Sequence, residues 1–325
     1  MKNREKKYKR IVHFVEDKIM SGEYRIGDKI PSVNAWNIRF GLSRSSVFLA
    51  MNELKARGLI EVEPSVGYFV ASDEVKFQEK VLLLFNELTV FKEDLYNAFI
   101  NAVGDDVSTN LIFHHYNRTV FETLLQKCNG KYTTYVLMPG KFEGLAHILR
   151  SLSGRVILLD HCHQDLRGEF PFVGLDFAED TYRALCLGLE EIRKYHTVTL
   201  VQREGFEPDE RYIGISRFCR EYGFIPRMVE TLNDHPLEKG VLYITATDRE
   251  MVNILKKVMA QGFALGKDIG VISFNETPMK EILCGGITTL STDFKQMGRT
   301  LARMVKEKTT ETIINPCTLI IRSSI

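Results

Sequence analysis

The residues that follow Gly41 place hydroxyl, guanidinium and aromatic side chains at the start of a predicted helix. Ser43 can accept hydrogen bonds from the backbone amides of the first turn and so marks the start of that helix. Apolar residues then recur at helical spacing and predict one buried face, made by Val47, Ala50, Met51 and Leu54. The opposite face holds Arg44, Ser45, Phe48 and Asn52. The arginine, serine and asparagine side chains of this face can donate hydrogen bonds to a polyanion.

The elements around this helix predict a small domain. An apolar stripe at Ile11, Phe14, Val15 and Ile19 predicts a first helix, and Ser32 can cap a second one that buries Trp36 and Phe40. Gly58 ends the third helix, and residues 59–63 and 67–70 read as two strands joined by a turn. Three helices and a β wing predict a winged helix-turn-helix, whose last helix enters a DNA major groove.

Charge is distributed unevenly along the chain. Residues 1–72 hold 13 Lys and Arg against 8 Asp and Glu, whereas the remainder holds 30 against 34. The basic end favours a polyanionic partner, although a small domain with a solvated basic face needs no partner at all.

Length and composition bound the class of protein. The chain has 325 residues, 44% hydrophobic and 26% charged, which predicts two globular domains. No secretory signal or membrane-spanning run is evident, so we expect a cytoplasmic protein. The six cysteines contain no CxxC pair, and we expect no disulfide framework, no metal and no cofactor.

The first 70 residues contain several motifs in order. They are SGEYRIGDKIPS (21–32), GLSRSSV (41–47), LKARGLI (54–60) and GYFV (67–70). This series resembles the DNA-binding domain of GntR-family regulators. The resemblance implies that Arg44, Ser45 and Ser46 contact phosphates and base edges, and that Gly67 lies at the wing tip close to the minor groove.

The sequence departs from the GntR pattern at three positions. Asn34, Phe48 and Val66 stand where the family usually has basic residues. We keep Asn34 and Phe48 among the candidate DNA contacts, with Phe48 packing on a thymine methyl group. The alternative is a winged helix retained for protein contacts.

A charged stretch at 73–80 predicts a linker, so the head comprises residues 1–72 and a second domain residues 81–325. That domain alternates strand and helix patterns, which predicts an α/β fold of two doubly wound parallel-sheet lobes. Strands are predicted at 80–85, 110–114, 134–138, 155–159, 172–175, 197–201, 241–245 and 269–274, and helices at 91–103, 118–128, 142–152, 182–193, 209–222 and 249–261. Ligands of this architecture bind at the carboxyl ends of the strands, in a cleft between lobes.

The second lobe carries further motifs. They are VGLD (173–176), RYIG (211–214), ITATD (244–248), GFALGKDIGVISFN (262–275), TTLSTDF (288–294) and LIIRSS (319–324). This order resembles the effector domain of LacI-family repressors, and its union with a GntR-type head is similar to sugar-responsive regulators of the arabinose-repressor type. The resemblance implies that Arg211 pairs with sugar hydroxyls, that Asp248 accepts from two of them, and that Asp160 makes a third polar contact.

Other interpretations of these residues stay open at this point. Asp248 can cap the helix that follows it, and Arg211 can form a surface ion pair. Strand ends supply further candidate ligand contacts at Phe91, His114, Lys141 and Asn275. The stretch His161-Cys162-His163 contains zinc-binding residue types, but a fourth ligand is not evident.

Together the two resemblances imply a homodimeric DNA-binding repressor of carbohydrate utilisation, controlled by a small sugar. By the same resemblance a pentose or 6-deoxyhexose is the expected effector, and the sign of its effect is open. One alternative is a sugar phosphate or a purine-like ligand, with Lys141 and Arg211 receiving the anion. A sugar-processing enzyme is a more distant alternative, because no G-x-S-x-G, P-loop or dinucleotide motif is present.

Overall fold

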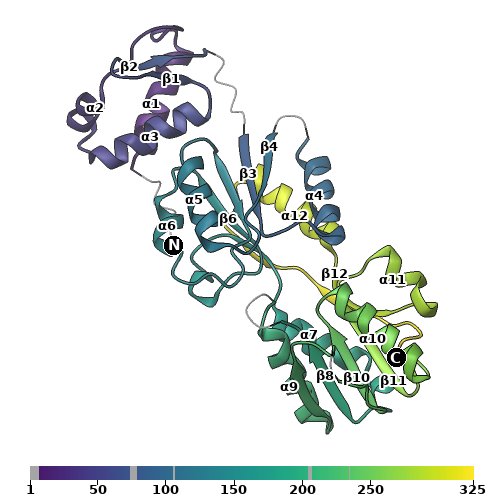
Figure 1. Ribbon diagram of the computed structural model, residues 1–325. Coiled ribbons are helices and arrows are strands. Elements are labelled where there is room, and N and C mark those ends of the chain that lie inside the picture. Colours follow the sequence, from purple (N-terminus) through teal and green to yellow (C-terminus); the bar gives the residue numbers. More distant parts are fainter. Residues whose placement is uncertain (1–6, 74–78, 105–106, 204–206, 234) are drawn as a thin grey trace. The chain divides into compact units, whose positions relative to one another are not determined.

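The computed structural model describes residues 7–73, 79–104, 107–203, 207–233 and 235–325 (Figure 1). The chain forms two compact units. The first comprises Met1–Glu87, Val103–Leu159 and His163–Pro171, and the second comprises Leu88–Ala102, Asp160–Cys162 and Phe172–Ile325. Most of the linker predicted at 73–80 lies outside the described residues.

The N-terminal head consists of three helices and a two-stranded wing (Figure 1). The helices are Lys9–Met20 (α1), Val33–Phe40 (α2) and Arg44–Ala56 (α3), and the strands are Ile60–Glu63 (β1) and Gly67–Val70 (β2). The two strands pair antiparallel, with Glu61 opposite Phe69. The predicted winged helix-turn-helix is confirmed.

The head builds a hydrophobic core from its own residues. Trp36 is fully buried, and its ring lies 5.7 Å from that of Phe14 in an edge-to-face arrangement. All buried members of this core lie between Tyr8 and Val70 in the sequence. The described residues of the head thus form a hydrophobic core of their own.

The sheet of the first lobe has six strands, and two short ones, Phe172–Gly174 (β7) and Thr312–Ile314 (β13), follow β6 in the order β4-β3-β5-β6-β7-β13. The other four strands are parallel. They are Glu79–Phe85 (β3), Val107–Phe113 (β4), Thr134–Leu137 (β5) and Arg155–Asp160 (β6), and the helices between them are Val90–Val103 (α4), Arg118–Cys128 (α5) and Ala146–Ser151 (α6). In this order β4 lies on one side of β3, and β5 and β6 follow on the other side of β3. This is the order of a doubly wound fold.

One predicted helix of this lobe is shorter than expected. A helix was expected over 142–152, but α6 spans only Ala146–Ser151. The reason is a turn in which the Phe142 amide donates to the Pro139 carbonyl, followed by Gly144 with φ of 67°. A left-handed glycine ends a helical path, so the apolar pattern before it belongs to a loop.

The second lobe has five parallel strands and one antiparallel strand, in the order β14-β12-β11-β10-β8-β9. They are Thr197–Val201 (β8), Ile225–Val229 (β9), Val241–Thr245 (β10), Ile269–Phe274 (β11), Thr288–Thr292 (β12) and Cys317–Ile320 (β14). The strands β7 and β13 are not part of this sheet, and they pair parallel with each other in the sheet of the first lobe. The parallel strands repeat the doubly wound order, so the prediction of two such lobes is confirmed.

The helices that follow β7 in the chain are Phe177–Leu187 (α7), Leu189–Ile192 (α8), Glu210–Tyr222 (α9), Asp248–Gln261 (α10), Pro278–Ile282 (α11) and Phe294–Glu307 (α12). The helix predicted at 182–193 begins five residues earlier, since the Asp176 carboxylate accepts from the Glu179 amide and caps α7. Among the described residues, no helix is long and apolar enough to cross a membrane.

Candidate nucleic-acid interface and ligand site

The first turn of α3 is organised around Ser43. Its hydroxyl oxygen accepts from the Ser46 amide at 3.3 Å and lies 2.9 Å from the hydroxyls of both Ser45 and Ser46. The two predicted contact serines therefore belong to one hydrogen-bonded group at the helix start. The backbone amides at a helix N-terminus favour anions, which suits a phosphate neighbour.

Arg44 is exposed at the start of α3 and contacts a residue of α2. Its Nε and Nη2 atoms donate to the amide oxygen of Asn34, at 3.1 and 2.7 Å. The sequence suggested each of these residues separately as a DNA contact, and the structure brings the two together.

The rest of α3 follows the predicted division into faces. The four residues of the apolar stripe are fully buried, and Phe48 is 46% exposed on the other side. Asn52 departs from the expectation because it is half-buried. In the first half of the helix the exposed residues are Arg44, Ser45 and Phe48.

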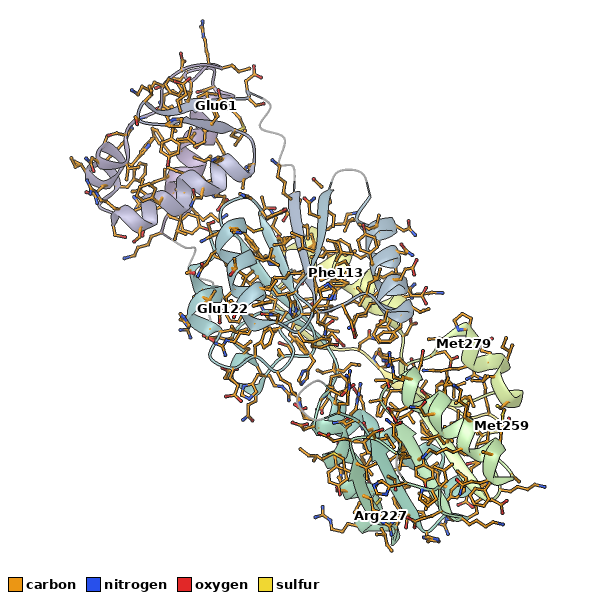
Figure 2. All side chains as sticks on the ribbon, in the orientation of Figure 1. Glu61, Phe113, Glu122, Arg227, Met259 and Met279 are labelled. Carbon is orange, nitrogen blue, oxygen red and sulfur yellow. The ribbon has the colours of Figure 1, made fainter. Side chains whose placement is uncertain are left out.

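The wing tip contains a basic residue that the sequence reasoning missed. Gly67 has φ of 146°, and a Cβ atom there would lie 3.0 Å from Cε of Lys29. Lys29 also pairs with Phe69 in an isolated antiparallel bridge, and its ammonium lies 5.9 Å from the Phe69 ring centre. Lys29 therefore provides a cation beside the wing, whose strand β1 carries the acidic Glu61 (Figure 2) and Glu63. The lysine in the loop Gly27-Asp28-Lys29 is the sequence feature that could have indicated this cation.

In the second unit, Arg211 lies in the first turn of α9 and is only 6% exposed. Its guanidinium carbon is 4.1 Å from the ring centre of Phe274, at the end of β11, and 5.2 Å from that of Phe177, at the start of α7. Cation–π contacts of this kind hold a guanidinium plane in one orientation. Arg211 is therefore a buried residue and not a surface one.

Asp248 is the first residue of α10, but Thr247 caps that helix by accepting from the Glu250 amide. The Asp248 carboxylate is about half exposed and lies 2.8 Å from the ammonium of Lys280. Asp248 is thus a partner in an ion pair at the carboxyl end of β10.

Lys280 is the main residue of this region that the sequence reasoning missed. It is 1% exposed, and its ammonium donates to the carbonyls of Phe274 at 2.8 Å and Asn275 at 2.6 Å as well as to Asp248. Burial lowers the pKa of Lys280, while the Asp248 carboxylate raises it. Its neighbour Met279 lies on the outer side of α11 and is half exposed (Figure 2). Lys280 therefore fastens α11 to the ends of β11 and α10.

Two of the predicted ligand contacts occupy unusual backbone conformations. Asp160, which ends β6, has φ of 68°, and Asn275, directly after β11, has φ of 64°. Aspartate and asparagine tolerate this left-handed region better than most residues, and such positions cluster at functional sites. Both residues belong to the second unit, as do Arg211 and Asp248.

Family comparisons agree with this geometry in both parts of the chain. Residues 7–70 match the family described as bacterial regulatory proteins, gntR family, and residues 185–325 match the family described as periplasmic binding protein-like domain. The chain carries a GntR-family helix-turn-helix domain and a periplasmic-binding-protein-like domain.

The GntR-family domain has curated relatives. The uncharacterized HTH-type transcriptional regulator YdfD of Bacillus subtilis (strain 168) is 51% identical over 67 residues, which cover 21% of this chain and 14% of that protein. The chain therefore spans a small part of the length of this relative, and the similarity is confined to the head.

Solved structures resemble the remainder of the chain. A LacI family transcriptional regulator from Silicibacter pomeroyi has a TM-score of 0.66 at 17% identity, with 76% of this chain and 98% of that chain covered. A periplasmic binding protein/LacI transcriptional regulator from Alkaliphilus metalliredigens QYMF, complexed with D-xylulofuranose, has a TM-score of 0.60 at 12% identity, with the same coverage of both chains. Similarity at this level of identity shows the two-lobed fold.

Two further predicted contacts of the periplasmic-binding-protein-like domain lie in the first unit. His114 is fully buried, with Nε2 3.0 Å from the Met138 carbonyl and the Phe121 ring at 5.1 Å. Lys141 is half-buried in the loop after β5. Their contact with a ligand stays a prediction.

The sequence predicted only some of the aromatic contacts in the second unit. The ring of Phe91 packs on that of Phe294 at a tilt of 36°, with ring centres 4.7 Å apart. His161, weighed earlier as a metal ligand, lies 3.2 Å from the Glu210 carboxylate through Nε2 and edge-to-face on Phe177 at 5.3 Å. The sequence signal for Phe177 and Phe274 was their place just after or at the end of a strand.

Proposed function

We propose that this chain is a sequence-specific DNA-binding transcriptional regulator that acts in the cytoplasm as a repressor of carbohydrate utilisation. The observation that carries this proposal is the exposed first half of α3, which presents Arg44, Ser45, Ser46 and Phe48 opposite a fully buried apolar stripe. Such a helix start fits a major groove, where donors meet base edges and phosphates. In this proposal residues 1–72 are the head, 73–80 the linker, and 81–325 the effector-binding and dimerisation domain.

The proposed effector is a small sugar bound by the periplasmic-binding-protein-like domain. Arg211 supplies guanidinium donors and aromatic neighbours, and Asp248 supplies a half-exposed carboxylate. Vicinal hydroxyls can pair with such groups, and rings can cover the C–H face of a sugar. Similar folds from Alkaliphilus metalliredigens and Arthrobacter sp. FB24 are complexed with D-xylulofuranose and with lactose, which supports a sugar as the class of effector. The chain is proposed to be a regulator and not an enzyme, as the proteins it matches are named as transcription regulators.

A phosphorylated sugar is the second candidate effector. The cationic groups Arg211 and Lys141 would then receive the anion. The two effector classes differ in salt dependence, since the affinity for an anionic ligand falls more steeply as salt is added.

The regulator is proposed to act as a homodimer. Two recognition helices would then read half-sites related by a two-fold axis. An effector changes DNA affinity only through its different affinity for two arrangements of the protein, so either release or tightening is compatible with this design.

The test has one DNA arm and one effector arm. The full chain is first incubated with a library of random duplexes at physiological salt, and enrichment of one motif with two-fold symmetry supports the proposal. A thermal-shift panel of pentoses, hexoses, deoxyhexoses and their phosphates is then run beside Asp248→Asn. An effector at 100 times its Kd should stabilise the chain by roughly 2.7 kcal/mol. No enriched motif would refute DNA reading, and no stabilising sugar would refute sugar control while leaving DNA reading intact.

A further inference from the structure

The contact between Arg44 and Asn34 links the two helices of the helix-turn-helix across ten residues of sequence. Asn34 lies in the first turn of α2 and Arg44 is the first residue of α3. Two donors of the guanidinium, on Nε and Nη2, converge on the single amide oxygen of Asn34 at 3.1 and 2.7 Å. Both residues are exposed, so this is a supported side chain on the outer surface of the head.

The geometry divides the guanidinium into a used edge and an open edge. An arginine has five N–H donors in a rigid planar arrangement. The edge formed by Nε and Nη2 faces Asn34, and no described residue accepts a hydrogen bond from Nη1. The edge formed by Nη1 and the second Nη2 proton is therefore available. Two parallel donors of this kind match the O6 and N7 acceptors of guanine in the major groove.

The residue type at position 34 determines which role it can have. The GntR pattern has a basic residue there, which would repel Arg44 and could bind a phosphate itself. Asn34 carries no charge, and its oxygen is already occupied by Arg44. Asn34 therefore makes no charged contact with DNA itself, and instead supports Arg44, which does.

The serine group at the same helix start adds a second fixed point. Ser43 caps α3 and holds the Ser45 and Ser46 hydroxyls at 2.9 Å, so the backbone that carries Arg44 is itself anchored. A long side chain loses considerable rotamer freedom when it binds. Holding Arg44 before DNA arrives reduces that loss, which is the usual benefit of preorganisation.

We propose that Asn34 is a positioning residue that holds Arg44 with its outer edge toward the major groove, and that Arg44 reads a guanine in each half-site. The inference rests on the proposed DNA-reading function and names the base that this side chain selects. Asn34 contributes to sequence preference without adding a phosphate contact.

The experiment measures base preference and salt dependence separately. The full chain and the variants Asn34→Ala, Asn34→Asp, Arg44→Ala and Arg44→Ala/Asn34→Ala are each selected against one library of random duplexes. Affinities for the enriched sequence and for its single-base variants are then measured at several salt concentrations. Thermal unfolding of every variant checks that the head is folded.

We expect Arg44→Ala to abolish preference for one guanine, a loss of roughly 5- to 150-fold in discrimination. Asn34→Ala should weaken preference at that same position by about 3- to 10-fold, the effect of losing one supporting hydrogen-bond acceptor, and leave the other positions unchanged. Asn34→Asp keeps the acceptor and should retain the guanine preference, with weaker binding to all sequences because its charge repels phosphates. The double variant should match Arg44→Ala, since Asn34 acts only through Arg44.

Several results would overturn the inference. Asn34→Ala could weaken all sequences equally and reduce the salt slope by about one, as expected for a direct phosphate contact. It could also leave guanine preference intact, or Asn34→Asp could lose the preference as fully as Asn34→Ala does. If the wild-type chain enriches no motif, the proposed function is refuted. If it enriches a motif that has no guanine at the Arg44 position, only the present inference is refuted.

Discussion

The two arginines singled out by the sequence sit in opposite environments. Arg44 is exposed on the head and is held by one amide oxygen of Asn34. Arg211 is almost fully buried, with aromatic rings of Phe274 and Phe177 within 5.2 Å of its guanidinium carbon. The first is held at the surface, where a partner can reach its open edge, whereas the second is packed inside a core.

This difference separates recognition from stability. Removing an exposed side chain alters what a protein binds and has little effect on folding, while removing a buried one affects both. The chain provides a convenient probe, because its single tryptophan, Trp36, lies in the core of the head. Tryptophan fluorescence therefore reports unfolding of the head, and far-UV circular dichroism reports the whole chain.

The largest expected effect is that of Arg211→Ala. Loss of two cation–π contacts and of buried packing should lower the free energy of unfolding of the second unit by about 2–4 kcal/mol. Urea unfolding followed by circular dichroism should show this loss, while the fluorescence transition of the head stays in place. Arg44→Ala is the matched control and should change stability by less than about 0.5 kcal/mol. Equal effects of the two substitutions would contradict the comparison.

Lys280→Met should have the next largest effect. The apolar side chain keeps the volume but leaves the carbonyls of Phe274 and Asn275 without the ammonium donor, a loss of about 1–3 kcal/mol at neutral pH.

The pH dependence sharpens this prediction. The pKa of Lys280 is lowered in the folded protein, mainly by burial, so the unfolded chain holds this proton to higher pH. Stability contributed by this group should then rise as pH increases through the window below 10.5, and Lys280→Met should lack that rise. Urea titrations at pH 7, 9 and 10 measure both curves. Parallel curves for the two proteins would show that Lys280 does not titrate differently on unfolding.

Asp180→Asn should have a smaller effect of opposite sign. Burial, with a contribution from the nearby Asp176, raises the pKa of Asp180 to about 6, from an ordinary value of 3.8. The folded state thus holds this proton more tightly, and its stabilising contribution is present below pH 3.8 and lost as pH rises through about 6. At pH 7 the amide should stabilise the second unit by on the order of 1 kcal/mol, allowing for partial exposure of the carboxyl group. Urea midpoints at pH 4 and pH 7 test this, and a gain that is the same at both would contradict it.

The smallest effect on stability is expected for Phe48→Ala in the head. The ring is 46% exposed, so the fluorescence transition should move by less than about 0.5 kcal/mol. Its effect should appear in DNA selection, as a weaker preference for thymine at one position, because the ring packs on a methyl group. Unchanged preference at every base pair would exclude this role.

Local patterns in the sequence were sufficient for much of the fold. The apolar stripe of α3, the caps at Ser32 and Ser43 and the helix Arg118–Cys128 each depend on residues a few positions apart. The helix expected over 142–152 failed because a left-handed Gly144 interrupts an otherwise helical pattern.

The site was predictable only in part, since its key contacts join distant residues. Arg211 was found through a motif, but its aromatic neighbours lie 34 residues before and 63 residues after it. Nothing in the five residues of α11 distinguishes Lys280 from an exposed lysine, because its partner Asp248 lies on another helix. The Asn34 contact similarly needed the turn between α2 and α3 to be built.

The separate core of the head has a consequence for folding during synthesis on the ribosome. Its buried residues all lie within the first 70, so this part can fold while the ribosome is still making the remainder. Both six-stranded sheets must wait, since β14 at 317–320 pairs with β12 in one sheet, and β13 at 312–314 pairs with β7 in the other. A nascent chain would therefore possess a folded GntR-family head well before its periplasmic-binding-protein-like domain is complete.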